Sequence, residues 1–437
     1  MLLGEQLSSG RQLYGEVWTH ISPLSGMVYW LCFELFGKTR WIYILLGGIL
    51  SVYQAGMFNS LLIRKDVYNE KTYIPALLYI VFQAASIDFL ILSPGLIALT
   101  FLLYMLKSIL ELSDRGKDQD IFRVGLSLGI ATLLHFPTFA FIGVVVWGVG
   151  SFRVLAFRQL MLVLFGISIV WVGMGIYYLF LGIFPDFYQH YILANLTLSN
   201  SPYADWQGVL WLQALPVLMA LWGFTKALGE RSFVNFQVSC QWLMFIWLLS
   251  GVGSLLLSPQ FAVYQLIVVL PAVSFFVAHA YLLQEKRWLA ELSFVSVLAL
   301  LLFLNFGHSL IARFSKLESP YEALVLPEPP WEVEGEQIWV LGEASSYYRN
   351  NRLATPFLNW ELTESYLEQL DSYNVVTRIY REIEAQPPVF IVDMEGKMGE
   401  LFSRAPLLKR NYEQDPQDSS IYRRKVDAGD GQADSAP

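Results

Sequence analysis

Charged and polar side chains gather in residues 1–41 of a chain that is otherwise strongly apolar. Glu5 and Glu16 are carboxylates, and Arg11, Lys38 and Arg40 are cations in the same segment. A carboxylate deprotonates or orients an attacking hydroxyl, and cations stabilise a phosphate that leaves with negative charge. We therefore assign Glu16, with Glu5 as an alternative, to the first role and the three cations to the second. The competing interpretation is that the cations reach lipid headgroups and the carboxylates are only solvated.

Further polar residues stand near the ends of later apolar segments. Asp88 is a candidate for a supporting catalytic acid, although an acid there also serves to cap a helix. Asp186, Tyr188 and His190 lie together in the sequence, and they predict contact with a substrate or a lipid headgroup. A proton relay, a metal pair and an interfacial aromatic belt are the alternatives. Two possible ligands do not make a metal site, so no metal-binding residue is assigned. Tyr14 is a further candidate for contact with a sugar.

Composition places these residues in a membrane protein. The chain has 437 residues, of which 55% are apolar and 15% charged, and its mean hydropathy is +0.45. A soluble domain is nearer one-quarter charged, so a disordered protein, a disulfide scaffold and an ordinary cytosolic enzyme are excluded. Apolar runs long enough to cross a bilayer recur from residue 41 to residue 310. The ten expected spans are 41–63, 73–92, 95–111, 124–135, 138–152, 159–184, 210–228, 237–257, 261–283 and 288–310.

Lysine and arginine orient the bundle. Loops that contain them alternate with loops at 88–94, 136–137, 185–209 and 258–260 that contain none. Basic loops face the cytoplasm, so we expect a multi-pass protein of the cytoplasmic (inner) membrane with residues 1–40 and the region after 310 extracytoplasmic. The region after residue 310 carries a net charge of −9 and the rest of the chain a net charge of +1. An acidic C-terminal region argues against a nucleic-acid partner.

Two segments leave the topology open. Residues 1–40 need a span to carry them across the membrane, and segment 24–36 is short and contains Glu34. We expect an interfacial helix there and a first span that is missing from this sequence, the alternative being that 24–36 itself crosses. The pair 124–135 and 138–152 is interrupted by Pro137, and it predicts either a broken hairpin or one long kinked helix.

The region after the last span has a different composition. We expect a linker over 311–335, an extracytoplasmic α/β domain over 336–426 and a disordered tail over 427–437. Within the domain, the apolar patterns predict strands at 337–341 and 389–392 and an edge strand at 421–424. Helical spacing falls at 362–370, 375–383 and 398–402.

The first segment also resembles a known superfamily. The residues that carry the resemblance are Leu7–Gly10, Leu13–Glu16, Ser22-Pro23-Leu24, Tyr29-Trp30 and Leu35-Phe36-Gly37. They are similar to the first outer loop of the GT-C superfamily of integral-membrane glycosyltransferases, in particular its protein-mannosyltransferase-like branch. The later spans also resemble an uncharacterised bacterial multispanning family, for example at Tyr73–Tyr79 and Gly125–Pro137.

The resemblance implies a glycosyltransferase that uses a polyprenyl-phosphate sugar as its donor substrate. In the superfamily the principal catalytic acid lies shortly after the first span, upstream of the region that matches Leu7–Gly10, so this sequence begins after it. Glu16 matches the second acidic position of the pattern, and Glu5 is the other acid near enough to substitute. His20 stands where many relatives carry a basic residue or a histidine, which implies a place in the lipid-phosphate site.

The sequence therefore favours transfer of a sugar from a polyprenyl phosphate to an extracytoplasmic protein, lipid or glycan. The expected partners are membrane lipids, the lipid-linked sugar and an envelope protein or glycan as acceptor, and a metal requirement stays open. The alternative is a non-catalytic membrane scaffold whose C-terminal domain binds envelope proteins. A transporter is disfavoured because no inverted repeat is evident and few charges lie inside the spans.

Overall fold

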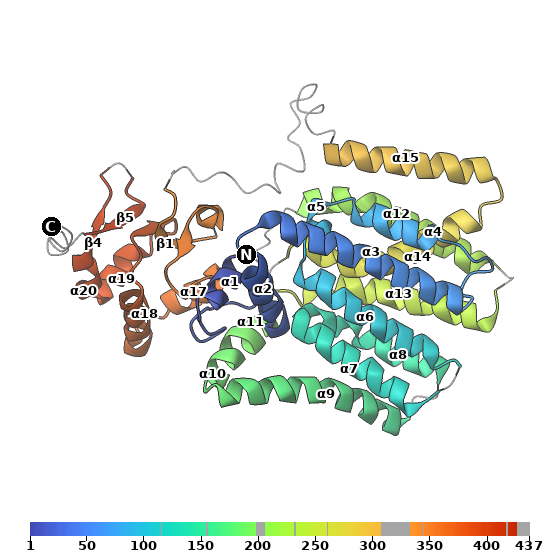
Figure 1. The fold of residues 1–437 in the computed structure, drawn as a ribbon, viewed down its shortest axis with the longest axis horizontal. Helices are drawn as coiled ribbons and strands as arrows, with labels where there is room; N and C mark the ends of the chain where they lie inside the picture. The colour runs from blue at the N-terminus through green and yellow to red at the C-terminus, as the bar shows by residue number, and fades with distance from the viewer. Residues whose placement is uncertain are drawn as a thin grey trace.

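The protein is a helical bundle with a small mixed sheet at one end (Figure 1). The structure is a computed structural model that describes residues 1–114, 116–153, 156–197, 206–230, 233–259, 261–306, 333–343, 345–416 and 418–425. The predicted polytopic bundle with a C-terminal α/β domain is confirmed. The predicted tail over 427–437 and most of the predicted linker lie outside the described residues.

Five of the described helical segments are long and apolar enough to cross a membrane. They are α3 (Arg40–Arg64), α6 (Pro94–Glu111), α9 (Phe157–Phe180), α13 (Asn235–Leu256) and the continuous segment Val263–Leu282, formed by η3 (Val263–Val269) and α14 (Leu270–Leu282). Shorter apolar helices accompany them: α2 (Pro23–Phe36), α4 (Ile74–Gln83), η1 with α8 (Phe136–Phe141 and Ile142–Phe152) and part of α12 (Trp206–Gly229). The remaining helical elements outside the C-terminal domain are α1 (Leu2–Ser8), α5 (Ile87–Leu90), α7 (Asp118–Leu134), α10 (Phe184–Phe187), η2 (Tyr188–Leu193), α11 (Ala194–Leu196) and α15 (Arg287–Phe306).

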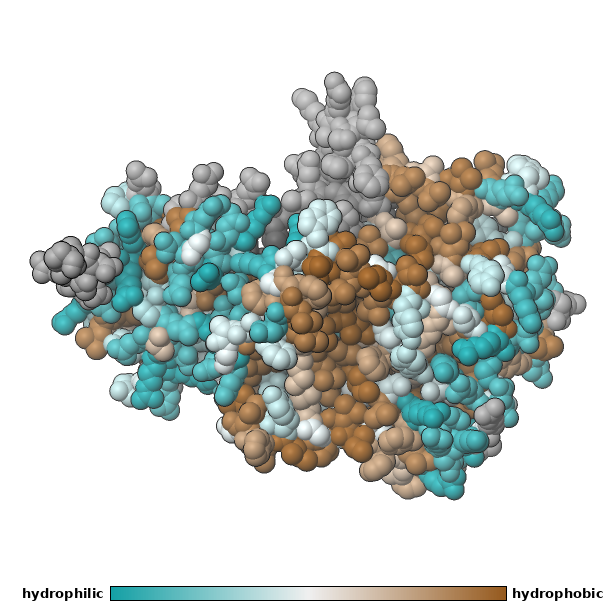
Figure 2. All heavy atoms as spheres, in the orientation of Figure 1, coloured by the Kyte–Doolittle hydropathy of each residue, from teal (hydrophilic) through white to brown (hydrophobic). Residues whose placement is uncertain are grey.

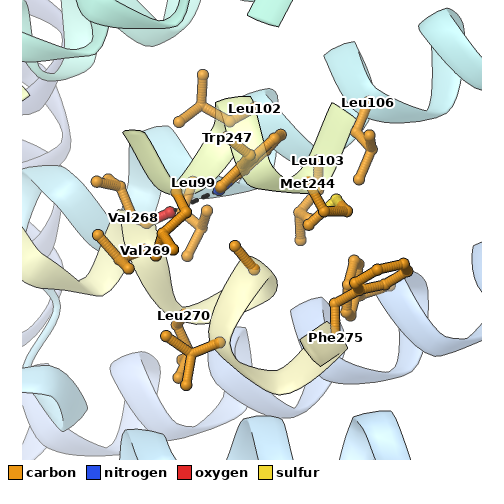
Figure 3. Close-up of a cluster of buried hydrophobic side chains, with 14 of the residues drawn as sticks. Leu99, Leu102, Leu103, Leu106, Met244, Trp247, Val268, Val269, Leu270 and Phe275 are labelled. Carbon is orange, nitrogen blue, oxygen red and sulfur yellow. Dashed lines mark hydrogen bonds between the residues drawn. The ribbon is translucent and has the colours of Figure 1, made fainter. Parts of the chain in front are cut away.

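The bundle has a dry core and an apolar outer surface. Figure 3 shows leucines of α6 packed against Met244, Trp247 and Phe275 of α13 and α14. The Trp247 indole N–H donates to the Val268 carbonyl at 2.8 Å, which satisfies the one polar atom of that side chain. Apolar side chains form a brown band over the bundle in Figure 2, while hydrophilic residues cover both ends. An apolar belt between polar ends is the surface that a lipid bilayer requires.

Glycine permits a close contact between helices α7 and α9. A Cβ atom on Gly125 of α7 would lie 2.1 Å from the carbonyl oxygen of Val163 on α9. Gly166 meets α7 in the same way, because its Cβ would lie 2.6 Å from the Phe122 carbonyl oxygen. Small residues let membrane helices approach closely. They hold α9 against α7 and so place the end of α9 near the N-terminal segment.

The interrupted pair around Pro137 is a hairpin. Helix α7 begins at Asp118, earlier than expected, and the chain turns in η1 before α8 runs back. Arg153, which follows α8, forms an ion pair with Asp118 at 3.5 Å. Because the two ends of the pair meet at one face of the bundle, a single kinked helix is excluded.

The expected span at 73–92 is wrong in its length. Helix α4 ends at Gln83, and the chain turns before α5. The Gln83 amide donates to the Phe89 carbonyl at 3.0 Å and also bonds Ser51. The bond to Phe89 satisfies a backbone carbonyl beyond the end of the helix, as a break in a membrane helix requires.

The C-terminal domain is a five-stranded sheet in the order β2-β1-β3-β5-β4. The strands are β1 (Gln337–Leu341), β2 (Arg352–Leu353), β3 (Phe390–Asp393), β4 (Tyr412–Gln414) and β5 (Ile421–Arg424). The helical elements of the domain are η5 (Ser345–Tyr348), α17 (Trp360–Leu367), α18 (Tyr373–Ala385), α19 (Met398–Arg404) and α20 (Pro406–Asn411). Strand β1 is parallel to β2 and β3, whereas β5 is antiparallel to its neighbours.

Most of the elements predicted in this domain are present. The strand predicted at 421–424 is present as β5, but its expected place at the edge of the sheet is wrong, because β4 pairs with β5 on its outer side. Strand β4 was missed because only Tyr412 of its three residues is buried, so it carries no alternating apolar pattern.

Candidate active site

A tight turn presents Glu16 at the surface. The Gln12 backbone N–H donates to the Glu16 carboxylate at 2.7 Å, and the Tyr14 N–H donates to the Val17 carbonyl at 3.0 Å. Tyr14 adopts a φ of 72°, which is uncommon outside glycine and persists only where packing fixes it. We call this segment turn 12–17. It holds the Glu16 carboxylate in an exposed position.

Packing of Tyr14 explains why the turn is rigid. Its ring is fully buried and contacts the rings of Tyr178 and Phe187 at centroid distances of 5.4 and 5.6 Å. The phenol hydroxyl donates to the Ile21 carbonyl at 2.6 Å. The expectation that Tyr14 contacts a sugar is therefore corrected, because in this conformation no face of the ring reaches a ligand.

The C-terminal domain holds the turn at both ends. The Arg11 guanidinium donates to the carbonyls of Ala354 and Thr355 at 2.9 and 3.4 Å. After the turn, the Trp18 N–H donates to the Pro356 carbonyl at 2.8 Å, and Trp18 pairs with Phe357 in a parallel bridge. The residues on both sides of the turn therefore contact the same short segment, 354–357, of the C-terminal domain.

Trp18 belongs to the core of the C-terminal domain. Its ring is fully buried, and it contacts the rings of Phe357, Tyr366 and His190 at centroid distances of 4.9, 4.4 and 4.7 Å. The Arg378 guanidinium lies 4.7 Å from the centre of the same ring. Residues from the start, middle and end of the sequence therefore share one small core.

His190 is a buried link in this core. Its Nδ1 lies 2.8 Å from the Tyr14 carbonyl oxygen. Because a carbonyl oxygen can only accept, Nδ1 carries a proton and donates it. Its Nε2 lies 3.2 Å from the Tyr366 hydroxyl. Burial lowers the pKa of His190 to about 4, against the opposing effect of the bond to Tyr14. The expected role of His190 at a substrate is corrected, since a fully buried ring holds the fold together.

This depressed pKa predicts acid sensitivity. Between about pH 6.5 and pH 4 the unfolded His190 binds a proton that the folded one does not, so its contribution to stability is present above pH 6.5 and is lost as the pH falls. The loss amounts to at most about 3 kcal/mol. Melting temperatures measured from pH 7.5 to 4.5 should fall more steeply for the native protein than for the His190→Gln variant. Equal slopes would contradict this assignment.

An apolar groove opens beside Arg11. Its volume is about 740 Å³. Arg11 is the only charged residue among the described residues that line it. The groove is lined by residues before and within turn 12–17, by helices α2, α6, α7 and α9 and by the segment after α9. These residues are Leu7, Arg11, Gln12, Leu13, Leu24, Met27, Val28, Trp30, Leu31, Ile97, Phe101, Ile130, Leu134, Tyr177, Tyr178, Leu181 and Ile183.

Arg11 remains a cation although it is partly buried. The side chain is half-buried, and burial lowers its pKa while Glu16 and Glu382 act in the opposite direction. An arginine stays charged under such a shift. The groove therefore combines an apolar lining with one cation, and the Glu16 carboxylate lies near that cation.

His20 lies at a second cavity of about 420 Å³. Its Nδ1 accepts from the Asn359 amide at 3.0 Å, and burial lowers the pKa of the imidazole. The cavity is otherwise lined mainly by α17 and contains several glutamates: Glu343, Glu361, Glu364 and Glu368. Carboxylates surround His20 there, so its expected place at a lipid phosphate is corrected.

The four basic candidates do not form one phosphate site. Lys38 forms an ion pair with Glu5 at 3.2 Å, and its ammonium also donates to the Asn351 carbonyl at 3.4 Å. Arg352 approaches the same Glu5 carboxylate at 4.0 Å. Arg40, the first residue of α3, is exposed. Of the four, only Arg11 reaches the groove, and Glu5 is bound in a structural ion pair.

The other candidate residues, Asp88, Asp186 and Tyr188, lie apart from the groove lining. Asp88 lies in the first turn of α5 and is exposed, with its backbone N–H bonded to Ser86. Asp186 forms an ion pair with Arg378 at 2.8 Å. Tyr188 is 51% exposed, which fits an interfacial aromatic better than a buried ligand contact.

Sequence reasoning missed Arg378 and Glu382, which α18 brings to turn 12–17. Glu382 is half-buried, and burial raises its pKa while Arg378 and Arg11 lower it. Both side chains lie on an amphipathic helix that the sequence does predict, but nothing local connects them to residue 16. Among the described residues, no group of three potential metal ligands is found.

The chain shares its fold with a solved structure of another protein. A solved structure of ArnT from Cupriavidus metallidurans bound to undecaprenyl phosphate matches with a TM-score of 0.54 and 13% sequence identity, covering 96% of this chain and 91% of that one. At this identity the match establishes the shared fold. Comparisons with protein families and with curated proteins found no match.

Proposed function

We propose that the protein is a membrane glycosyltransferase that transfers a sugar from a polyprenyl-phosphate donor to an extracytoplasmic acceptor. The observation that carries this proposal is the apolar groove with Arg11 as its charged lining residue. A polyprenyl phosphate has the same two parts, a long apolar chain and one anionic headgroup. The ArnT structure, which contains undecaprenyl phosphate, supports the proposal through its fold.

In this mechanism Arg11 binds the donor phosphate and stabilises the charge that it gains as the glycosidic bond breaks. Glu16 acts as the base or orienting group for the acceptor hydroxyl. The resemblance of residues 7–37 to the protein-mannosyltransferase-like branch makes a polyprenyl-phosphate hexose the first donor to test. The site would face outward at the cytoplasmic membrane, since the basic loops lie at the opposite end.

The direct test is sugar transfer by the protein in proteoliposomes supplied with radiolabelled polyprenyl-phosphate sugars. Transfer that depends on the protein would support the proposal. Its absence with every donor, for protein that melts cooperatively, would refute it.

The groove makes a separate prediction about binding. Arg11→Gln should weaken the binding of undecaprenyl phosphate about 10- to 100-fold, because a hydrogen bond to a charged group contributes about 1.5–3 kcal/mol. The binding of undecaprenol, which lacks the phosphate, should be unchanged. Ile130→Trp, which fills the groove, should weaken the binding of both lipids. Quenching of protein fluorescence in detergent micelles would measure the affinity of the native protein and of each variant for both lipids.

Val146 provides the matched control for the groove. It lines a different apolar depression, formed mainly by α8, which shares no lining residue with the groove beside Arg11. Val146→Trp adds the same ring and should leave both affinities unchanged. If Arg11→Gln weakens undecaprenol and its phosphate equally, then the side chain supports the groove wall and does not recognise phosphate.

The scaffold alternative receives less support from the structure. It requires the C-terminal domain to act as an independent binding module. Trp18, however, lies in the core of that domain, and Gln6 and Arg11 bond the backbone of residues 353–355. The N-terminal segment and the C-terminal domain therefore form one packed unit, which does not favour an independent binding module.

A further inference from the structure

Arg378 connects three parts of the chain. It lies on α18 of the C-terminal domain, and its guanidinium forms the ion pair with Asp186, which follows α9, at 2.8 Å. The Cζ atom of the guanidinium lies over the rings of Trp18 and Tyr366, 4.7 and 5.8 Å from their centres. One side chain therefore joins the bundle, the N-terminal segment and the C-terminal domain.

These contacts bear directly on the position of Glu16. Trp18 follows Glu16 by two residues, and its backbone fixes the end of turn 12–17 on Pro356. On the other side of the turn, a Cβ on Gly15 would lie 3.3 Å from the Ile183 side chain, which lines the groove. Movement of Trp18 or of the segment after α9 would therefore shift Glu16 relative to Arg11.

We propose that Arg378 is a positioning residue that fixes the Glu16 carboxylate relative to Arg11 and the apolar groove. It acts by clamping Trp18 and Asp186 together, without touching the substrate. This inference rests on the proposed transfer reaction for its kinetic consequence. The clamping of Trp18 and Asp186 by Arg378 can also be tested by a measurement that does not require sugar transfer.

Arginine suits the position for a geometric reason. Its planar guanidinium stacks on an aromatic face and donates in its own plane to a carboxylate at the same time. A lysine retains the charge and the attraction to Asp186, but it offers no flat face to Trp18. Conservative replacement by lysine should therefore restore only part of the effect of Arg378.

The kinetic test uses the full-length protein in nanodiscs. Arg378→Gln should lower kcat about tenfold, because a displaced catalytic group loses rate steeply with distance. The KM for the lipid donor should stay within about twofold, since Arg11 keeps its bonds to residues 354 and 355 and most of the groove is lined by helices that Arg378 does not contact. The kcat of Arg378→Lys should lie between those of Arg378→Gln and the native protein. Arg381→Gln is the matched control, because Arg381 is exposed on the same helix, and it should behave as the native protein does.

A spin label measures the clamp itself. Gln12 is exposed at the start of the turn, and the two native cysteines are buried, so a label on Gln12→Cys reports the mobility of the turn. In the Arg378→Gln background the label should become more mobile, and in the Arg381→Gln background it should not. Unchanged mobility in Arg378→Gln would overturn the proposal.

The two measurements separate the possible failures. If the native protein transfers no sugar but the label responds to Arg378→Gln, the clamp stands and the proposed function falls. If transfer occurs and Arg378→Gln raises KM with kcat unchanged, Arg378 binds substrate and the positioning role is refuted. Should Arg378→Gln fail to fold, Asp186→Asn breaks the same ion pair from the bundle side and must mobilise the label.

Discussion

Replacing Glu16 by glutamine should lower the rate of sugar transfer by about two to four orders of magnitude, the range that a general base contributes. The substitution preserves the fold of the turn. A glutamine oxygen can accept the Gln12 N–H in place of the carboxylate oxygen that accepts it at 2.7 Å. A loss of rate can then be attributed to the missing charge and basicity. Single-turnover transfer in proteoliposomes measures it.

Two other carboxylates should be replaced by the corresponding amides and compared with Glu16→Gln. Glu382 lies within the electrostatic range of both Glu16 and Arg11, so Glu382→Gln distinguishes between the two possible bases. Asp88→Asn examines the supporting acid expected from the sequence. Glu34→Gln is the control, because Glu34 is exposed and accepts a hydrogen bond from Ser8 at 2.7 Å. Full activity of Glu16→Gln with loss in Glu382→Gln would move the base to α18.

The sequence predicts the architecture because its signals are local. A run such as residues 237–257 is too long and apolar for any environment but a bilayer, and α13 occupies it within two residues. The strand at 337–341 is likewise a short apolar run closed by Gly342. Prediction failed where tertiary bonds override hydropathy, as at Gln83, whose side chain stabilises a break inside an apolar segment.

The site was predicted less completely because it is built from distant residues. Residues 11–20 carry polar side chains that suggest chemistry, and the structure keeps Arg11 and Glu16 together. Nothing in the local pattern indicates that Trp18 packs against Phe357 or that Arg378 reaches Asp186. Lys38 was predicted to belong to the site but does not, because its charge is paired with Glu5. Spacing suggests which residues are available, whereas long-range packing decides which of them are used.

Trp18→Ala should destabilise the C-terminal domain locally by about 3–5 kcal/mol, the usual loss when a buried tryptophan is truncated. The side chain fills the core between Phe357, Tyr366 and His190, and no described residue can replace it without a shift of the segment. Hydrogen exchange of segment 354–367 should rise by two orders of magnitude or more, while exchange in α13 should stay as it is. Trp41→Ala is the control, because Trp41 is 77% exposed. An unchanged exchange rate in Trp18→Ala would show that the C-terminal domain folds without the N-terminal segment. That result would remove the clamp on Glu16 and restore the domain as an independent binding module.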